Sequence, residues 1–367
     1  MKHDILSLDF WQDTVIYGGK VFDSGTLGCD SLNIPAETIA QLSGLCLALN
    51  QFMATMNMGF GSPALLPAAR ESAVKIGKLL KNVKPFSYLD SPNIIDGIGQ
   101  VFSKESLENA NAYYAAIQNG TLTSPTDPQY EKGLRLLRVL PVMAHLGFSL
   151  GEYQKMMISF AEKLGEPDCN RTPDGYAKLF GEAFPLTQNF GAGDAWMSMT
   201  NATLQYVPVI RPDRDEPMLV KRMHYVSFVG MFRSDLFEGL CVGHAPKKCP
   251  ICGRWFLTTN ARHTKYCGGY APGDKLHRTC RQIGNLKGRE QRELAEDHPV
   301  KRIYATRLNT INRSVKRGKL DTELAEVMKK LAKDKMYRAL SNAVYAQGDY
   351  EAEMEQAALL SEAASKL

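Results

Sequence analysis

Four of the eight cysteines lie in the 32 residues from Cys249 to Cys280, and their spacing is that of a metal site. Two residues separate Cys249 from Cys252, so both thiolates can face one ion, and Gly253 lets the backbone turn without a Cβ clash. Cys267 and Cys280 complete the pattern C-x2-C-x14-C-x12-C. Because a tetrahedral zinc site needs four such ligands, the sequence predicts one structural Zn²⁺ ion held by these four cysteines.

Histidines near the cysteines leave alternatives open. His263 lies four residues before Cys267, His277 lies three residues before Cys280, and His244 precedes the first pair. A histidine could replace one thiolate, or the segment could hold no metal. Four soft thiolate ligands suit zinc, so we favour the four-cysteine set.

The predicted metal centre is unsuited to catalysis. Catalytic zinc keeps one coordination position open for water and needs a general base beside it. Four cysteines leave no such position, and Asp274 is the only acid between the ligands. The sequence also lacks the motifs G-x-x-x-x-G-K-[ST], H-E-x-x-H and G-x-S-x-G. We therefore expect no catalysis; a nuclease or other hydrolase with an unrecognised site is the enzymatic alternative.

Positive charge is concentrated around and after the cysteines. Residues 244–319 contain 18 Lys+Arg and 5 Asp+Glu, whereas residues 1–243 and 320–367 have net charges of −5 and −3. Clustered positive charge attracts phosphate backbones by releasing their counterions, so we predict binding of DNA or RNA. The candidate contact residues are Arg254, Arg262, Lys265, Arg278, Arg281, Lys287, Arg289, Arg307, Arg313, Lys316, Arg317 and Lys319.

Aromatic rings are interleaved with these cations. Trp255, Phe256 and Tyr266 could stack on unpaired bases, but a small zinc ribbon also needs a hydrophobic core of its own. We expect the three rings to form that core.

The elements that must position these residues are mostly helices. We expect a mainly α fold, with an α-rich N-terminal domain containing minor β structure at residues 1–243. A basic zinc-ribbon-like module with a following helix is expected at 244–319, and a C-terminal helical hairpin at 320–367. The N-terminal domain is the candidate surface for a protein partner.

Individual elements follow from periodicity and turn residues. We predict a hairpin turn at Gly18-Gly19, a helix from Ala36 to Met58, a strand over 204–210 and a helix over 223–242. Another helix should begin near Pro299 and end near Gly318.

Side-chain acceptors mark several helix starts. The acceptors are Asp127, Ser149 with Glu152 three residues later, Thr172 and Asp321. Each is expected to cap the helix that follows it.

The other four cysteines indicate a reducing compartment. Cys29, Cys46, Cys169 and Cys241 are widely spaced, unlike the cysteines of a disulfide framework. We see no secretory signal, and polar residues interrupt the apolar stretch 38–60, which favours a buried helix over a membrane span. We therefore expect a cytoplasmic protein without a membrane segment.

The segments CPICGRWF, TKYC and RTC, with the later run Lys316-Arg317-Gly318-Lys319, resemble the C-terminal part of an uncharacterised bacterial domain family. Its members carry a C-x-x-C-G-[RK]-[YWF]-F knuckle, a Y-C and a T-C. The arrangement is more distantly similar to CGNR-type zinc fingers of transcription regulators, although no cysteine directly precedes Gly284-Asn285 here. The resemblance implies a zinc-binding, nucleic-acid-binding module behind a variable helical domain, and implies no activity.

These observations together favour a zinc-binding protein that binds DNA or RNA in a regulatory or defence-associated role. The alternative from another class is a protein-interaction adaptor whose zinc site is purely structural.

Overall fold

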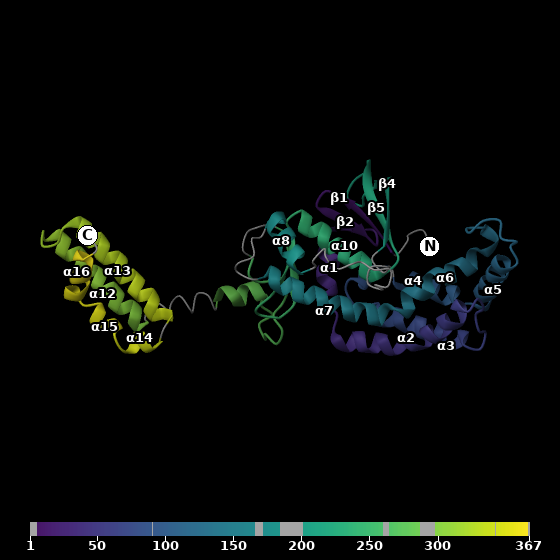
Figure 1. The fold of residues 1–367 in the computed structure, drawn as a ribbon, viewed down its shortest axis with the longest axis horizontal. Helices are drawn as coiled ribbons and strands as arrows, with labels where there is room; N and C mark the ends of the chain where they lie inside the picture. Colours follow the sequence, from purple (N-terminus) through teal and green to yellow (C-terminus); the bar gives the residue numbers. More distant parts are fainter. Residues whose placement is uncertain are drawn as a thin grey trace. The chain divides into compact units, whose positions relative to one another are not determined.

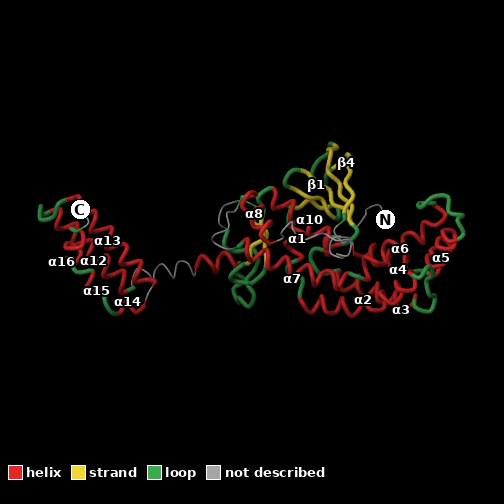
Figure 2. The backbone as a smooth tube through the Cα atoms, in the orientation of Figure 1, coloured by secondary structure: helices red, strands yellow, loops and turns green. Residues whose placement is uncertain are grey.

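The computed structural model describes residues 6–89, 91–165, 172–183, 201–259, 264–286, 298–341 and 343–365. The chain divides into two compact units, residues 1–267 and 268–367. Helices make up most of the described chain and strands a small part of it (Figures 1 and 2), which confirms the predicted mainly α fold.

The first unit contains a five-stranded antiparallel sheet with the strand order β3-β2-β1-β5-β4. The strands are β1 (Ser7–Trp11), β2 (Thr14–Tyr17), β3 (Lys20–Asp23), β4 (Ala202–Ile210) and β5 (Pro217–Tyr225). The predicted turn at Gly18-Gly19 joins β2 to β3, and the predicted strand 204–210 lies within β4. Asp9 of β1 faces Arg222 of β5 and forms a bidentate ion pair with it at 2.6 and 2.7 Å, so distant parts of the sequence meet in one sheet.

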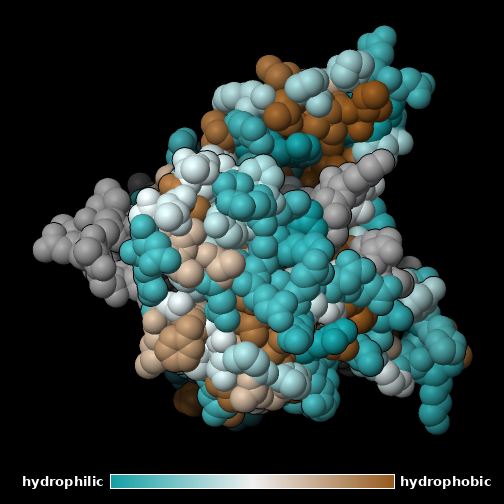
Figure 3. Space-filling model, turned by 90° about the vertical axis from the view of Figure 1, so that its right-hand side faces the viewer, coloured by the Kyte–Doolittle hydropathy of each residue, from teal (hydrophilic) through white to brown (hydrophobic). Residues whose placement is uncertain are grey.

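Strand β4 forms one edge of this sheet and is exposed over most of its length, with Pro208 in its C-terminal half. Leu204, Tyr206 and Ile210 of β4, and Leu219 of β5, are each about half to two thirds exposed. Figure 3 shows the apolar surface of the sheet at the top of the view. The sheet therefore presents apolar side chains to solvent where β4 and β5 extend beyond the core.

Nine helices of the first unit are described. They are α1 (Thr26–Ser31), α2 (Ala36–Asn57), α3 (Leu66–Leu80), α4 (Ser91–Val101), α5 (Lys104–Gln118), α6 (Glu131–Ala144), α7 (Leu146–Leu164), α8 (Pro173–Ala183) and α10 (Phe228–Cys241). Two short 3-10 helices, η1 (Phe86–Tyr88) and η2 (Pro128–Tyr130), lie between them. The predicted helix from Ala36 to Met58 is α2, which packs beside α3 and α7 (Figure 1).

Two of the predicted caps in this unit are confirmed and one is wrong. The backbone N–H of Gln129 donates to Asp127 at 3.0 Å, and that of Gly175 donates to Thr172 at 3.2 Å. Ser149 instead lies inside α7, where its hydroxyl donates to the carbonyl of His145 at 2.8 Å. Helix α7 begins at Leu146 because its buried apolar positions start there, three residues before the sequence pattern of a cap.

The predicted helix over 223–242 begins too early. Residues 223–225 belong to β5, because all three pair with β4 and the first two, Met223 and His224, also pair with β1. Helix α10 starts at Phe228, and Ser227 caps it by accepting the N–H of Gly230 at 3.0 Å. Pairing with strands far away in the sequence overrides the local helical pattern here.

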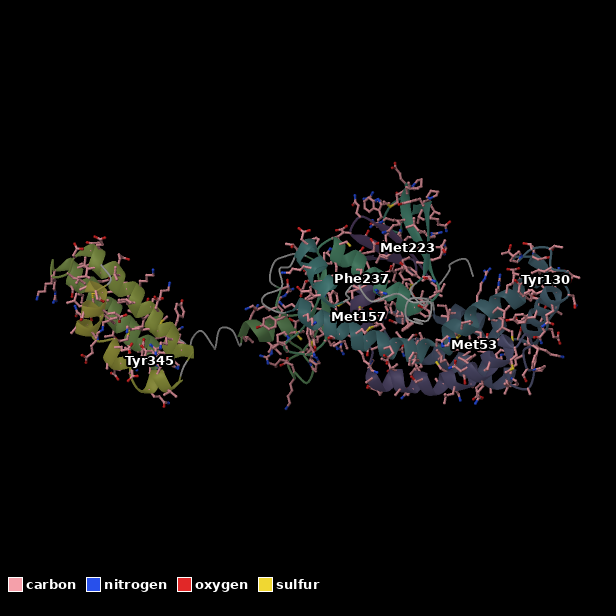
Figure 4. All side chains as sticks on the ribbon, viewed as in Figure 1. Met53, Tyr130, Met157, Met223, Phe237 and Tyr345 are labelled. Carbon is pink, nitrogen blue, oxygen red and sulfur yellow. The ribbon has the colours of Figure 1, made fainter. Side chains whose placement is uncertain are left out.

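The core of the first unit joins one face of the sheet to the helices. Leu8 and Phe10 of β1 are buried in the same cluster as Leu42 of α2 and Phe232 of α10. Met157 of α7 is fully buried in this core, and Phe237 of α10 is partly buried and packs against the core; both are labelled in Figure 4. Helix α10 therefore lies inside the unit and leads the chain to the first pair of cysteines.

The second unit ends in a helical bundle with a core of its own. Its helices are α12 (Pro299–Lys316), α13 (Thr322–Ser341), α14 (Ala343–Gln347), α15 (Tyr350–Glu353) and α16 (Gln356–Ala364). The predicted helix near 299–318 is α12, and Asp321 caps α13 by accepting the N–H of Glu323 at 2.9 Å. The segment predicted as a C-terminal hairpin contains α13, α14, α15 and α16, and α13 packs against both α12 and α16. Tyr350 is fully buried in this core and donates to the carbonyl of Val300 at 2.9 Å.

By length and composition alone, one described helix, α2, could cross a membrane. The segment Pro128–Ala144, which contains η2 and α6, passes the same test only together with α7, and the two are bent by 46° relative to each other. Leu42, Leu49 and Phe52 of α2 are fully buried in the core of the first unit. This agrees with the interpretation of α2 as a core helix.

Candidate metal centre and basic surface

Two short strands hold the first pair of cysteines. Strand β6 (Ala245–Lys248) pairs antiparallel with β7 (Trp255–Thr258). The turn between them contains Cys249 and Cys252, and the N–H of Gly253 donates to the carbonyl of Cys249 at 2.8 Å. Gly253 has a φ of 73°, a left-handed conformation that favours glycine. The predicted role of this glycine in the turn is confirmed.

The four predicted ligands come together. The Sγ atoms of Cys249, Cys252, Cys267 and Cys280 all lie within 4.8 Å of one another. Cys249 and Cys280 are buried, while Cys252 and Cys267 are half-buried with their Sγ atoms 3.6 Å apart. Zinc–sulfur bonds of about 2.3 Å in a tetrahedron place sulfur atoms about 3.8 Å apart, so the cluster has the dimensions that a metal ion of this kind requires.

Histidines do not belong to the described cluster. His277 is exposed, with a φ of 51°, and is not among the residues placed to hold an ion. His244 is buried, but its Nδ1 donates to the carbonyl of Ser24 at 2.8 Å. His263 lies outside the described residues. Cysteines alone make up the ligand set that the structure describes.

The surroundings of Cys249 favour its thiolate form. Burial acts to raise the pKa of this thiol, but hydrogen bonds from the N–H groups of Cys252, Cys267 and Ile251 outweigh burial and lower the pKa to about 6. Since the thiolate is the form that binds metals, these backbone N–H groups favour the form of Cys249 that can bind an ion.

The loop before Cys280 is braced by its own side chains. Tyr270 pairs with Thr279, and the N–H of Cys280 donates to the carbonyl of Gly269 at 2.8 Å. Asp274 accepts hydrogen bonds from the guanidinium of Arg278, the shortest at 2.6 Å, and from the backbone N–H of Arg278 at 2.8 Å. These bonds lower the pKa of Asp274 to about 2.

This ion pair bears on the contact predicted for Arg278. Arg278 was a candidate nucleic-acid contact, but its guanidinium is held by Asp274 inside the loop. Asp274 is the one acid between the ligands in the sequence, and a carboxylate with so low a pKa is a poor general base near neutral pH. The pair therefore shapes the loop.

A capping box follows the loop. The N–H of Gln282 donates to the Thr279 hydroxyl at 3.2 Å, and the N–H of Thr279 donates to the Gln282 side chain at 2.8 Å. A helical segment begins at Cys280 and is described as far as residue 286. The signal T-x-x-Q was present in the sequence, and sequence reasoning missed it.

The aromatic residues of this region separate into two kinds. Trp255 is buried in the core of the first unit, and Asn33 exchanges hydrogen bonds of 2.8 and 2.9 Å with its backbone. Phe256 and Tyr266 are half-buried. Tyr270, which the sequence did not single out, is 74% exposed. Trp255 is therefore a core residue, but it belongs to the core of the first unit and not to a separate ribbon core as expected, and Tyr270 is the most exposed of these four rings.

The predicted cations near the cysteines are only partly described. Arg254, Lys265 and Arg281 are exposed. The predicted contacts Arg262, Lys287 and Arg289 lie outside the described residues.

Helix α12 carries the densest run of positive charge in the described part of the second unit. Between Pro299 and Leu320 the sequence has no Asp or Glu. The cations there are Lys301, Arg302, Arg307, Arg313, Lys316, Arg317 and Lys319. Among the residues that the structure describes, none of these seven forms an ion pair. Four predicted contacts, Arg313, Lys316, Arg317 and Lys319, are exposed at its C-terminal end.

Arg307 differs from the other cations of α12. It is half-buried, and its Nε atom is buried without a hydrogen-bond partner in the described structure. Its position on the helix lies on the side of Val300 and Ile311, which are buried in the bundle. Arg307 is therefore less accessible to a ligand than the sequence predicted.

The rest of the bundle is acidic, and some of its acids form ion pairs within it. Residues 321–365 contain nine Asp and Glu against five Lys and Arg. Lys335 forms ion pairs with Glu353 at 2.6 Å and with Glu362 at 2.9 Å. Three of these nine acids form ion pairs in the described structure, Glu326 with Lys329 and both Glu353 and Glu362 with Lys335, and none of the nine pairs with a cation of residues 299–320.

Residues 197–366 match a protein family described as a family of unknown function (DUF6076). The match covers somewhat less than half of the chain, from the start of the β4–β5 hairpin to the end of the bundle. It agrees with the expected resemblance to an uncharacterised domain, and it does not by itself identify a zinc ribbon. No curated protein and no solved structure matches the chain significantly.

Proposed function

We propose that the protein binds one structural Zn²⁺ ion and uses basic surfaces of its C-terminal part to bind nucleic acid. The ligands of the ion are Cys249, Cys252, Cys267 and Cys280. Thiolate sulfur is the ligand type that favours zinc over magnesium or calcium, and the spacing of the four sulfur atoms suits a tetrahedral ion. A site filled by four thiolates leaves no position for water, so the ion stabilises the fold of its segment.

The observation that carries the nucleic-acid proposal is the uncompensated charge of α12. Surface cations of a globular protein commonly lie near acids, as Lys335 does near Glu353 and Glu362. Seven cations over residues 299–320 with no acid among them repel one another, which costs folding free energy. A polyanion relieves this repulsion and gains affinity because its condensed counterions are released.

A cytoplasmic, regulatory or defence-associated role fits this proposal. The buried thiols Cys29 and Cys46 are free cysteines, and free thiols persist in a reducing compartment. The protein-interaction adaptor remains the alternative if nucleic acid does not bind.

The test is a filter-binding or anisotropy assay of the full chain with random duplex DNA, single-stranded DNA and RNA at several salt concentrations. Wild type should bind at low salt, with an affinity that falls steeply as salt rises. Replacing Arg313 and Arg317 by Ala removes two phosphate contacts and should make the slope of log K against log salt less steep by about 1.8.

A matched control uses two exposed cations of the acidic part of the bundle. Lys330→Ala with Lys333→Ala changes the net charge by the same amount on α13. This variant should retain the wild-type slope. If wild type binds none of the three nucleic acids at low salt, the proposal is wrong and the adaptor alternative stands.

A further inference from the structure

Along the exposed face of α12, charged and neutral polar side chains occupy different parts of the helix. At about 100° per residue, positions 302, 306, 309, 313 and 316 fall within one quarter of the helix circumference. The side chains are Arg302, Thr306, Asn309, Arg313 and Lys316, of which all five are exposed. Asn312 and Arg317 flank this stripe and are also exposed. Cations occupy both ends of the face, and neutral hydrogen-bonding side chains occupy its middle.

The neutral residues in the middle do not serve the helix. Asn309 and Asn312 are interior helix positions, far from the N-terminal cap at His298. Asparagine there is roughly 0.5–0.7 kcal/mol less favourable than alanine. Neither amide forms a hydrogen bond with any residue in the described ranges. Both amides therefore present a free donor and a free acceptor to solvent.

Thr306 belongs to the same pattern. Its hydroxyl donates to the carbonyl of Arg302 at 2.8 Å, which leaves the oxygen lone pairs available to accept from a ligand. The middle of the face can therefore both donate and accept hydrogen bonds.

The shape of this face discriminates among nucleic acids. A helix with its side chains is about 10–12 Å wide, and the major groove of B-form DNA is about 12 Å wide. The major groove of A-form RNA is too deep and narrow for side chains to read. Binding of single strands relies on exposed aromatic rings, and α12 itself presents none, because Tyr304, its one aromatic residue, is half-buried in the bundle. The exposed ring of Tyr270 lies on the loop before Cys280, outside this helix.

The dimensions of the stripe fit the same groove. From Arg302 to Lys316 the helix rises about 21 Å, which exceeds the groove width. Cations at the two ends can then lie near the phosphates that border the groove while the middle faces base edges. Phosphate contacts fix the register, and contacts to base edges carry the sequence information.

We infer that α12 is a reading helix for the major groove of duplex DNA, in which Asn309 and Asn312 select adenine-containing sequences. An Asn amide donates to adenine N7 and accepts from its N6 amino group as a bidentate pair. The inference rests on the proposed function and deepens it, because it assigns duplex DNA as the ligand and base selection to two residues.

The test begins with selection of bound sequences from a random duplex library by the full chain, followed by affinity measurements on the enriched site and on random duplex. Wild type should enrich a site containing adenine and prefer it to random duplex. Asn309→Ala with Asn312→Ala should lower the affinity for that site by roughly 5-fold to 150-fold for each bidentate pair lost. Its affinity for random duplex and its salt dependence should stay unchanged.

Misfolding cannot imitate this result. Alanine is the better helix former at both exposed positions, so the double variant should be at least as stable as wild type. Replacing adenine by 7-deazaadenine in the enriched site removes the N7 acceptor without changing the shape of the duplex. Wild type should lose affinity for the modified site, and the double variant should not.

Two outcomes overturn the inference while leaving the proposed function intact. One is binding of random duplex without any enriched sequence. The other is an enriched site whose affinity is the same for wild type and the Asn variant. Failure to bind any nucleic acid would instead contradict the proposed function itself, so the two failures are distinguishable.

Discussion

Asp235 of α10 accepts the backbone N–H of Gly25 through Oδ1 at 3.0 Å, although the two residues are 210 positions apart in the sequence. Its second oxygen, Oδ2, accepts the N–H of Gly28, also at 3.0 Å. The carboxyl is fully buried. One side chain thus supplies the N-terminal cap of α1, whose own preceding residue is a glycine without a side chain.

We predict that Asp235→Ala destabilises the first unit by roughly 2–5 kcal/mol, because two buried N–H groups lose their acceptor. Trp11 and Trp255 lie in this unit, and residues 268–367 contain no tryptophan, so urea unfolding followed by tryptophan fluorescence reports on the first unit. Asp96→Ala, which removes an exposed acid of α4, is the control and should change stability by less than about 0.5 kcal/mol. Equal stability of the two variants would contradict the capping role.

The same carboxyl predicts a pH dependence. Burial raises its pKa from 3.8 to about 7, against hydrogen bonds from Gly25, Gly28 and Leu27 that lower it. The folded state therefore keeps a proton that the unfolded state has lost between these two values. The contribution of Asp235 to the free energy of unfolding is full below pH 3.8 and is lost as the pH rises through about 7.

Asp235→Asn isolates this contribution because its side chain stays neutral at every pH. The stability advantage of wild type over the Asn variant, measured by urea unfolding, should be larger at pH 5 than at pH 8. Parallel stability curves for the two proteins would show that the Asp235 carboxyl has an unshifted pKa.

Close packing of α1 against α10 gives a third prediction. A Cβ on Gly28 would lie 2.6 Å from the carbonyl oxygen of Phe232 and from Cβ of Leu236, so Gly28→Ala should destabilise the unit by about 1–3 kcal/mol. Gly44 of α2 has open space around it, so Gly44→Ala should stabilise by about 0.5–1 kcal/mol through helix propensity. Thermal unfolding of the two variants should show melting temperatures that move in opposite directions.

Removal of the metal is the fourth prediction. Elemental analysis should find about one zinc ion per chain, and Cys252→Ser should reduce it to a small fraction. A strong chelator should lower the thermal stability of wild type, and added zinc should restore it. Cys241→Ser is the matched control, because Cys241 is an exposed cysteine outside the cluster. Stoichiometric zinc in the Cys252 variant would remove this residue from the ligand set.

The sequence was informative where the determining interactions are local. The helices at 36–57 and 299–316 follow from apolar periodicity and terminal residues, and the turn at Gly18-Gly19 follows from two glycines between strand-like segments. The cysteine cluster was also predictable, because thiolates at metal-ligand spacing have few other uses in a reducing compartment.

The sequence was less informative where the partner is distant. Residues 223–225 look helical, and only their pairing with β1 and β4 makes them a strand. Nothing in the local sequence around Asp235 identifies it as the cap of a helix some 200 residues earlier. The ion pair between Arg278 and Asp274 also depends on the geometry of the loop. A count of charges in the sequence therefore includes Arg278 among the unpaired cations, although its guanidinium is paired.

Pro208 in the exposed strand β4 has a consequence for the protein at high concentration. An edge strand with apolar side chains is a template on which another chain can extend the sheet, which leads to aggregation. Proline is tolerated in an edge strand because its nitrogen faces away from the ladder, and that nitrogen has no hydrogen to donate. The outer rim of the sheet is therefore interrupted at the seventh of the nine residues of β4, and the apolar hairpin can stay exposed without recruiting further strands.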